Sequence, residues 1–244
     1  MKRMDKRIVQ VLALISFIVG VCMMAHSTRQ KVEDVLIVQI EKNDNNADTK
    51  MVMEQSIVHI SMKDSVGSGV IVSIQADDII VVSNKHLLQK DVEAAVTLAN
   101  GTTYEAEVLG LSQQYDIGFL KLRVPEPELS EVEQVSQIYE EESFYLGTAI
   151  LQYSSRQAGV IECYEGYISG DSQYMDEFHS EILQTNCYSA AGMSGGAVFH
   201  TNGEFLGMIA GGEVADDDMT RESEITYCIP AALIWDAYEE ACSK

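Results

Sequence analysis

A serine lies in the glycine-rich segment Gly192-Met193-Ser194-Gly195-Gly196, directly before the short apolar stretch Ala197-Val198-Phe199. A serine hydroxyl is a weak nucleophile unless a nearby base takes its proton and N–H donors stabilise the oxyanion that its attack creates. Glycines permit a sharp backbone turn that can aim several N–H groups at one point beside Ser194. The segment therefore indicates nucleophilic catalysis, on condition that a base and an acid occupy matching positions upstream.

His86 is the candidate for the base, because it follows the apolar stretch 79–82. This stretch is rich in β-branched residues, which favour a buried strand, so the imidazole would be held at a strand end. Asp116 precedes a second apolar stretch, 117–122, where a buried carboxylate can accept the imidazole N–H and select its tautomer. The order His86, Asp116, Ser194 predicts a catalytic triad, and the other histidines are interpreted as structural.

Four short motifs in this order resemble those of the HtrA/Deg family of chymotrypsin-like serine proteases. They are Gly67-Ser68-Gly69, Ser83-Asn84-Lys85-His86, Asp116-Ile117-Gly118-Phe119-Leu120-Lys121 and Gly192-Met193-Ser194-Gly195-Gly196. The resemblance runs from about Met53 to about Tyr238. It implies peptide-bond hydrolysis through an acyl-enzyme, with Ser194 as nucleophile, His86 as base and Asp116 as the residue that orients His86. Family members usually carry PDZ domains after their last helix, and since this sequence ends at Lys244 we expect a protease domain without PDZ.

The resemblance also places the oxyanion hole at Gly192, Met193 and Ser194, with the backbone N–H groups of Gly192 and Ser194 as the main donors. Met193 departs from the pattern, because the family usually has Asn there and the wider clan Asp. A polar side chain at this position helps to hold the loop through hydrogen bonds. We expect that methionine cannot do so, although its backbone N–H remains available.

Two further groups of residues are assigned to substrate binding by the same resemblance. The edge strand that would pair with the substrate backbone consists of Ala210, Gly211 and Gly212. One side of the primary specificity pocket consists of Tyr188, Ser189 and Ala190, and the other lies near Tyr227 and Cys228. Since no Asp or Lys is clearly placed at the base of this pocket, we expect a small or medium-sized apolar residue before the cleaved bond.

The elements that must position these residues are short strands separated by turns. Strands are expected at 56–62, 69–74, 79–83, 92–98, 103–110 and 117–122, and again near 143–150, 159–170, 181–187, 197–199, 204–211 and 225–229. A helix is expected at 231–242, opened by Pro230. The fold class is therefore all-β, with two six-stranded antiparallel barrels of the chymotrypsin type, an active site in the cleft between them and a C-terminal helix. The barrels would cover about 53–124 and 143–230 of a protease domain at 53–244.

The N-terminus differs from the rest of the chain. Lys2, Arg3, Lys6 and Arg7 precede an apolar run from Ile8 to Ala25, which as a helix would span about 27 Å, close to the thickness of a bilayer core. Residues 1–25 are interpreted as a membrane anchor that sends the protease domain out of the cytoplasm. The alternative is a cleaved signal peptide, which would make the protein secreted. Residues 26–52 form a polar connector.

The charge and the cysteine spacing of the chain limit the classes of molecule that it is expected to bind. The net charge is −22, from 38 acidic and 16 basic residues, so nucleic acid is not an expected partner. The acidic loop 213–218 has its acids largely in one consecutive run, without the alternating spacing of a calcium loop, and is interpreted as a solvated surface loop. The cysteines are widely spaced and include no closely spaced pair of the kind that binds a metal. One disulfide is possible outside the cytoplasm, and the sequence does not say between which cysteines. No metal or cofactor is expected.

These observations predict a membrane-anchored, extracytoplasmic serine endopeptidase that acts on protein or peptide substrates, with a role in protein quality control as one option. Two alternatives belong to other classes. One is a protease homologue that binds a peptide in its cleft without cutting it, which the departure at Met193 leaves open. The other, a small-molecule hydrolase, is disfavoured because the motif order does not suit an α/β-hydrolase. The sequence does not define the oligomeric state.

Overall fold

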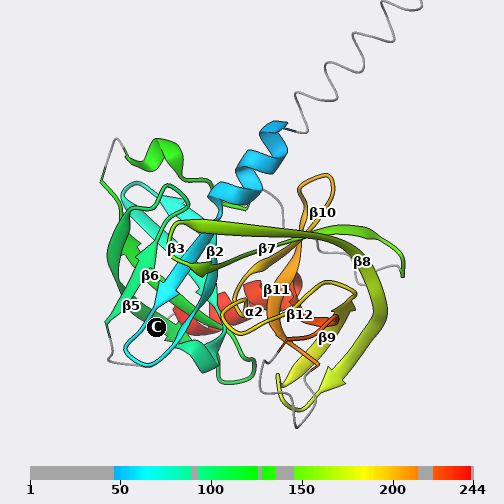
Figure 1. Ribbon diagram of the computed structural model, residues 1–244. Helices are drawn as coiled ribbons and strands as arrows, with labels where there is room; N and C mark the ends of the chain where they lie inside the picture. Colours follow the sequence, from blue (N-terminus) through cyan, green and yellow to red (C-terminus); the bar gives the residue numbers. More distant parts are fainter. Residues whose placement is uncertain (1–46, 89–92, 126–127, 136–145, 214–221, 243–244) are drawn as a thin grey trace, which may run out of the picture. The chain divides into compact units, whose positions relative to one another are not determined.

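The first six strands close into an antiparallel barrel in the computed structural model (Figure 1), which describes residues 47–88, 93–125, 128–135, 146–213 and 222–242. These strands are β1 (Ile57–Ser61), β2 (Val66–Gln75), β3 (Asp78–Ser83), β4 (Ala94–Thr97), β5 (Thr103–Leu111) and β6 (Gly118–Arg123). Their order around the barrel is β1-β2-β3-β6-β5-β4. The valines and isoleucines of β3 are buried, as expected for β-branched residues on a closed sheet.

A second antiparallel barrel follows with the order β10-β11-β12-β9-β8-β7. Its strands are β7 (Ala149–Gln157), β8 (Val160–Met175), β9 (Ser180–Thr185), β10 (Ala197–His200), β11 (Phe205–Gly212) and β12 (Thr226–Pro230). The expected pair of six-stranded barrels is confirmed. Between the barrels, the described chain forms one short 3-10 helix, η2 (Glu128–Glu131).

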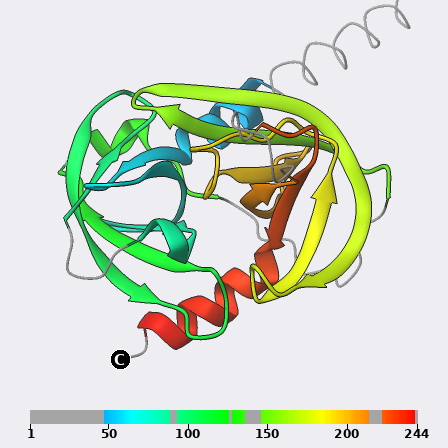
Figure 2. The ribbon, with the colours of Figure 1, turned by 60° about the horizontal axis from the view of Figure 1, so that its bottom comes forward.

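The helix α2 (Ala231–Cys242) joins the two barrels, as Figure 2 shows. It contacts β5 and β6 of the first barrel and β11 and β12 of the second. The ring of Tyr238 meets Phe119 of β6 edge to face, with ring centroids 5.3 Å apart. At its far end, Glu240 accepts hydrogen bonds from Ser112 Oγ at 2.9 Å and from the Gln113 N–H at 3.2 Å. The helix therefore helps to fix one barrel against the other.

Three apolar clusters hold this arrangement. One is drawn from the strands of the first barrel and includes Ile71, Val81 and Leu120. A second is drawn from the second barrel and includes Met193 and Ile209. The third combines residues of both barrels with α2, so it forms the interface on which the cleft depends.

The chain divides into the units Met1–Asp48 and Thr49–Lys244, and almost all of the first unit lies outside the described residues. The predicted anchor at 1–25 is in that part. Within the described ranges, no helix has the length and apolar character needed to cross a membrane. Residues 49–52, predicted as the end of a polar connector, are helical instead. The Met53 side chain anchors this helix, because it packs into the apolar cluster between the barrels, where it is only 1% exposed.

Two expectations about local structure need revision. The seventh strand, expected near 143–150, begins at Ala149 and runs to Gln157. The sequence pattern does not indicate this strand, because the polar residues Gln152, Ser154 and Ser155 occupy buried positions where apolar residues are expected. The disulfide that the sequence left open does not involve Cys163, Cys187 or Cys228, which are free thiols. Residues 214–218 of the acidic loop lie outside the described residues.

Candidate active site

His86 and Asp116 are placed by the ends of two paired strands. β3 ends at Ser83 and passes into the 3-10 helix η1 (Lys85–Leu87), which carries His86. β6 begins at Gly118, directly opposite Ser83 in the register of β3 and β6. Asp116, two residues before this point, therefore lies beside η1. The antiparallel pairing of two buried strands is what brings residues from distant parts of the sequence together.

Asp116 is 8% exposed, and its carboxylate is hydrogen-bonded through both oxygens. Oδ2 lies 2.7 Å from Nδ1 of His86, and Oδ1 accepts the backbone N–H of His86 at 2.9 Å. Asn84, which is fully buried, donates to Oδ2 at 3.2 Å. Because an ionised carboxylate can only accept, Nδ1 of His86 carries the proton and Nε2 is left as the basic nitrogen. The predicted base and its orienting acid are thus in contact.

Ser194 occupies a turn that only glycines can complete. Gly192 has a φ of +89° and Gly195 a φ of +87°, a region that other residues rarely adopt. The Met193 N–H donates to the Ala190 carbonyl at 3.1 Å, which closes a four-residue turn with Gly192 at its third position. A positive φ there is the requirement of a type II turn. A side chain at Gly195 would collide with the carbonyl of Ser68 on β2.

The peptides of this turn are oriented by hydrogen bonds on their carbonyl side. The Met193 carbonyl accepts from the Gly196 N–H at 3.0 Å, and the Ser194 carbonyl accepts from the Ser68 N–H at 2.8 Å. Within the described residues, the N–H groups of Gly192 and Ser194 donate to no protein acceptor. Two unpaired donors beside a serine can stabilise an oxyanion. The N–H of Met193, in contrast, is used by the turn, so it is not free for that purpose.

Met193 holds the turn in a way that the sequence did not suggest. Its side chain is fully buried in the cluster of the second barrel, together with Val198 and Ile209. Its sulfur accepts the N–H of Ala190 at 3.2 Å, a weak interaction for a thioether. The expectation that methionine cannot hydrogen-bond the loop is therefore wrong. Apolar packing in this cluster also fixes the position of the side chain.

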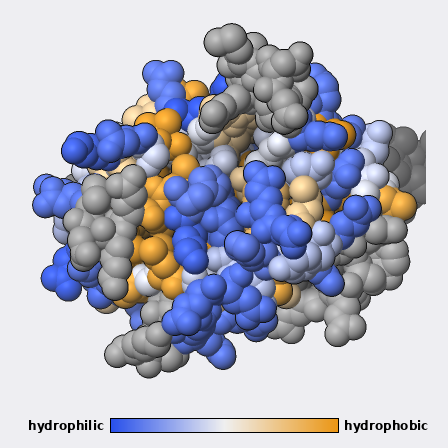
Figure 3. Space-filling view, turned by 90° about the horizontal axis from the view of Figure 1, so that it is seen from below, coloured by the Kyte–Doolittle hydropathy of each residue, from blue (hydrophilic) through white to orange (hydrophobic). Residues whose placement is uncertain are grey.

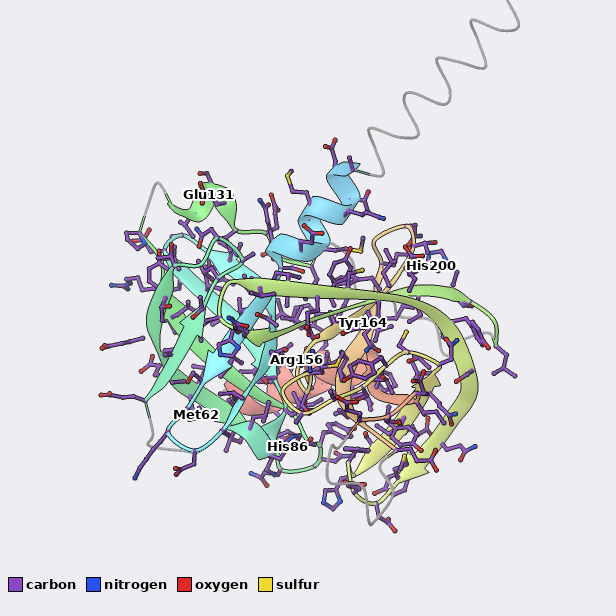
Figure 4. The ribbon with its side chains drawn as sticks, viewed as in Figure 1. Met62, His86, Glu131, Arg156, Tyr164 and His200 are labelled. Atoms are coloured by element: carbon purple, nitrogen blue, oxygen red, sulfur yellow. The ribbon has the colours of Figure 1, made fainter. Side chains whose placement is uncertain are left out.

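The Ser194 hydroxyl is not yet joined to the other two residues. Among the described residues, Oγ donates to the carbonyl of Ala210 at 3.3 Å and makes no hydrogen bond with His86. The His86 side chain is 47% exposed, so one side of its ring faces solvent. Figure 4 shows His86 at the lower end of the first barrel. Catalytic hydrogen bonds are often long or misaligned before substrate binds, so this arrangement is compatible with a triad that closes later.

A cavity of about 420 Å³ opens beside His86 and Asp116. One wall is the end of β11, the residues Ala210, Gly211 and Gly212. β10 pairs with β11 between Phe205 and Met208, and Gly195 and Gly196 extend these hydrogen bonds to Ile209. Within the described chain, no further backbone pairing covers this side of β11 beyond Ile209. A bulge falls at Ala210, between the pairs of Ile209 and Gly211 with β12. The residues predicted as the substrate-binding edge do line the cavity.

The segment 188–190 approaches β11 closely. Ser189 is 4% exposed and exchanges two backbone hydrogen bonds of 2.8 Å with Ser223. A side chain placed at Gly212 would lie 2.7 Å from Cβ of Ser189. Ser189, on one predicted wall of the specificity pocket, therefore lies close to Gly212 of the predicted substrate-binding edge.

Some residues of the site were not found from the sequence. Asn84 belongs to the motif that contains His86, and its position next to a strand end is the signal that could identify it as a partner of Asp116. Phe178 and His179, at the turn between β8 and β9, line the cavity, and the Phe178 carbonyl accepts the Asp116 N–H at 3.4 Å. No local pattern connects residues so far apart in the chain. His200, interpreted as structural, accepts the Asn202 N–H at 3.2 Å in its own turn.

The two barrels, the cleft and the His86–Asp116 pair define a protein of the chymotrypsin-like class. Residues 67–208 match the family model described as "Trypsin-like peptidase domain". This match covers more than half of the chain, and the protein belongs to that family.

Individual relatives point to the HtrA branch. The chain is 31% identical over 151 residues to "Serine endoprotease DegS" of Haemophilus influenzae, which covers 59% of this chain and 41% of that protein. It is 24% identical over 197 residues to "Serine protease HtrA-like" of Staphylococcus aureus strain MRSA252, covering 75% of this chain and 24% of that protein. The solved structure "HtrA-type protease AlgW with tripeptide" superposes with a TM-score of 0.68 at 18% identity, over 80% of this chain and 62% of that one. The chain spans less than half the length of these curated relatives. The predicted fold and the predicted resemblance to HtrA-like proteases are confirmed.

Proposed function

We propose that the chain is a serine endopeptidase that hydrolyses peptide bonds through Ser194, His86 and Asp116. The observation that carries the proposal is the paired geometry of His86 and Asp116, with Nδ1 to Oδ2 at 2.7 Å, beside a serine whose turn leaves two N–H groups without acceptors in the described part of the protein. This combination supplies a base of defined tautomer and an oxyanion site. The membership of the trypsin-like peptidase family supports it.

The reaction would follow two acyl-transfer steps. Nε2 of His86 removes the proton of Ser194 Oγ while Oγ attacks the substrate carbonyl, and the oxyanion is stabilised by the N–H groups of Gly192 and Ser194. His86 then gives the proton to the leaving amine, and an acyl-enzyme remains. In the second step, His86 removes a proton from water, which attacks the acyl carbonyl. The bond between the acyl carbon and Ser194 Oγ then breaks, His86 returns the proton to Oγ, and the acid product is released. Asp116 stays ionised and stabilises the imidazolium.

Substrate binding would bring Ser194 into position. The free edge at the end of β11 can accept a peptide strand by backbone hydrogen bonds. A substrate N–H that donates to the Ala210 carbonyl would take the acceptor now used by Ser194 Oγ at 3.3 Å. The hydroxyl would then turn to Nε2 of His86. Full assembly of the three residues is thereby coupled to the presence of a peptide.

We also propose that the substrate carries a small apolar residue before the cleaved bond. The close approach of Gly212 to Ser189 supports this, since a Cβ at Gly212 would lie 2.7 Å from that of Ser189. Hydrophilic side chains cover much of the face shown in Figure 3, and the net charge of −22 disfavours strongly acidic substrates at long range.

We further propose that the protein acts outside the cytoplasm, attached to the membrane through residues 1–25. The basic residues before the apolar run of Ile8–Ala25 support this orientation. A role in protein quality control would fit an endopeptidase that recognises extended peptides through their backbone. Protease accessibility of the domain in intact cells, compared with permeabilised cells, tests the location.

Hydrolysis of a labelled unfolded protein tests the proposed activity. The full chain should release new peptides, and Ser194→Ala and His86→Ala should release none. Binding of the labelled protein without any cleavage by the wild type would contradict the proposal and support a non-catalytic peptide-binding protein instead. Mapping the new amino termini identifies the residue before the cleaved bond.

A further inference from the structure

Ser68 connects the first barrel to the turn that carries Ser194. It lies in β2 and is fully buried. Its N–H donates to the Ser194 carbonyl at 2.8 Å. Its hydroxyl donates to the Gly192 carbonyl at 3.1 Å and accepts the N–H of Ser155 on β7 at 2.9 Å. One residue thus joins three segments: β2, β7 and the turn.

The hydroxyl of Ser68 is the side-chain contact that fixes the Gly192–Met193 peptide. The N–H of this peptide is bonded to the Ala190 carbonyl, and its carbonyl is bonded to Ser68 Oγ. Since a peptide group is planar, these two bonds together set its orientation. The N–H groups of Gly192 and Ser194 belong to the peptides on either side of it. A rotation of the Gly192–Met193 peptide would therefore turn these N–H groups as well.

Ser68 is itself held rigidly. Ser83 Oγ donates to the Ser68 carbonyl at 2.7 Å. Across the strand pair, His59 lies opposite Ser68 in β1, and its Nδ1 donates to the Ser155 carbonyl at 2.8 Å. Ser155 is therefore fixed on both sides of its backbone, by His59 and by Ser68. A hydroxyl held this way is a defined reference point for the turn.

On the outer side, Arg156 covers the same turn. Its Cβ and Cγ lie 3.5 Å from the position that a side chain at Gly192 would take. The guanidinium forms a two-pronged ion pair with Glu162, at 2.6 and 2.8 Å, and lies 5.9 Å from the ring centroid of Tyr188. Figure 4 shows Arg156 close to Tyr164. The turn is thus packed from outside. Among the described residues, Ser68 is the only residue from another segment whose side chain hydrogen-bonds to the turn, since the Met193 sulfur belongs to the turn itself.

We infer that Ser68 is a positioning residue for the oxyanion site, and that it supplies the polar support that Met193 provides only weakly. Ser68 touches no substrate and acts through the Gly192–Met193 peptide. The inference rests on the proposed function, since an oxyanion site has meaning only in an acyl-transfer enzyme. Interactions that matter in the transition state change kcat, whereas those that act equally on the bound substrate change KM.

The test compares Ser68→Ala and Ser68→Cys with Ser154→Ala in the full chain. Ser154 is a matched control, because it is a fully buried serine on β7 whose hydroxyl has no partner among the described residues. Removal of an oxyanion donor lowers kcat by about 100- to 1000-fold in comparable enzymes, and misorientation should cost less, about 10- to 100-fold. We expect this loss in both Ser68 variants with KM within about twofold, and no loss in Ser154→Ala. Affinity for a peptide boronic acid, which forms a tetrahedral adduct, should fall in parallel with kcat.

Thermal unfolding shows whether each variant is folded. If the alanine variant does not fold, Ser68→Cys still fills the γ position, with a somewhat larger atom that is only a weak hydrogen-bonding group. Wild-type kcat in a folded Ser68 variant, or an equal loss in Ser154→Ala, would overturn the inference. A wild-type protein with no peptidase activity would instead overturn the proposed function, and the inference with it. The two failures are distinguished by the wild-type measurement alone.

Discussion

At the scale of single residues, the site is a set of polar groups whose hydrogen bonds leave them one orientation. Asp116 has both carboxylate oxygens occupied, by His86 and Asn84. A carboxylate held in this way directs the imidazole without itself taking the proton. Met193 shows a different solution, in which a buried apolar side chain stabilises the turn beside the nucleophile.

Asp116→Asn should abolish most of the activity without unfolding the protein. The amide has the same shape, but it no longer selects the tautomer with a free Nε2. We expect kcat to fall by about 10⁴-fold, with the melting temperature nearly unchanged. Kinetics on a peptide substrate measure this, and a variant within tenfold of the wild type would show that Asp116 does not orient the base.

Met193→Leu and Met193→Ala should separate volume from the sulfur contact. Leucine conserves the volume and should cost less than about 1.5 kcal/mol of unfolding free energy. Alanine leaves a cavity in a fully buried position and should cost about 2–5 kcal/mol. Urea unfolding of both variants checks the difference. Equal destabilisation would mean that the contact between the sulfur and the Ala190 N–H, at 3.2 Å, dominates over packing.

At the scale of elements, the cleft depends on strand ends and on one long hairpin. The turn between β8 and β9 brings Phe178 against Gly211. A Cβ placed at Gly211 would lie 3.4 Å from the Phe178 ring. The same turn reaches the backbone of Asp116. His179 next to it has a φ of +53°, an uncommon conformation for a residue with a side chain. This hairpin therefore forms a wall of the cavity.

Phe178→Ala should weaken substrate binding more than chemistry. The ring is 5% exposed and supports the substrate-binding edge, so we expect KM to rise several-fold. Loss of a buried aromatic ring should also lower the unfolding free energy by about 3–5 kcal/mol. Steady-state kinetics well below the melting temperature measure the first effect. A fall in kcat at constant KM would contradict this role.

Ser189→Gly should widen the pocket that we propose for the residue before the cleaved bond. The Ser189 side chain is what most closely faces Gly212, with Cβ and Oγ at 2.7 and 2.8 Å from the position that a methyl group at Gly212 would take. Profiling with a peptide library should show small apolar residues for the wild type and larger ones for the variant. A wild-type preference for basic or acidic residues would contradict the proposed specificity.

Sequence patterns predicted most strands because short apolar stretches, such as the β-branched run of β3, alternate with clear turns. They misplaced the start of β7, whose buried residues include Gln152 and Ser155. Local motifs also identified the chemical groups of the site. The contacts of Ser68 and Phe178 could not be predicted, because they join segments far apart in the chain through backbone carbonyls, which carry no sequence signal.

At the scale of the whole molecule, two barrels are joined by a shared apolar interface and by α2. The second barrel also contains buried free thiols. Burial raises the pKa of Cys187 to about 11 and that of Cys228 well above 9.0. These thiols stay neutral in the folded protein at pH values where the unfolded chain ionises.

Stability should therefore fall as the pH rises above about 9. Each thiol has a higher pKa in the folded state than in the unfolded state, so its contribution is complete below about pH 9 and is lost as the pH rises further. For Cys187 the loss extends towards pH 11. Urea unfolding between about pH 8 and pH 10.5 measures the decline. The decline should be smaller in Cys187→Ala, and an identical pH dependence in that variant would contradict the assignment to Cys187.

Reaction with a fluorophosphonate probe tests the central claim most directly, because the probe modifies only a serine that a base has activated. The full chain should be labelled at Ser194, and labelling should vanish in Ser194→Ala and fall sharply in His86→Ala. A folded wild-type protein that remains unlabelled would show that Ser194, His86 and Asp116 do not form a working catalytic triad.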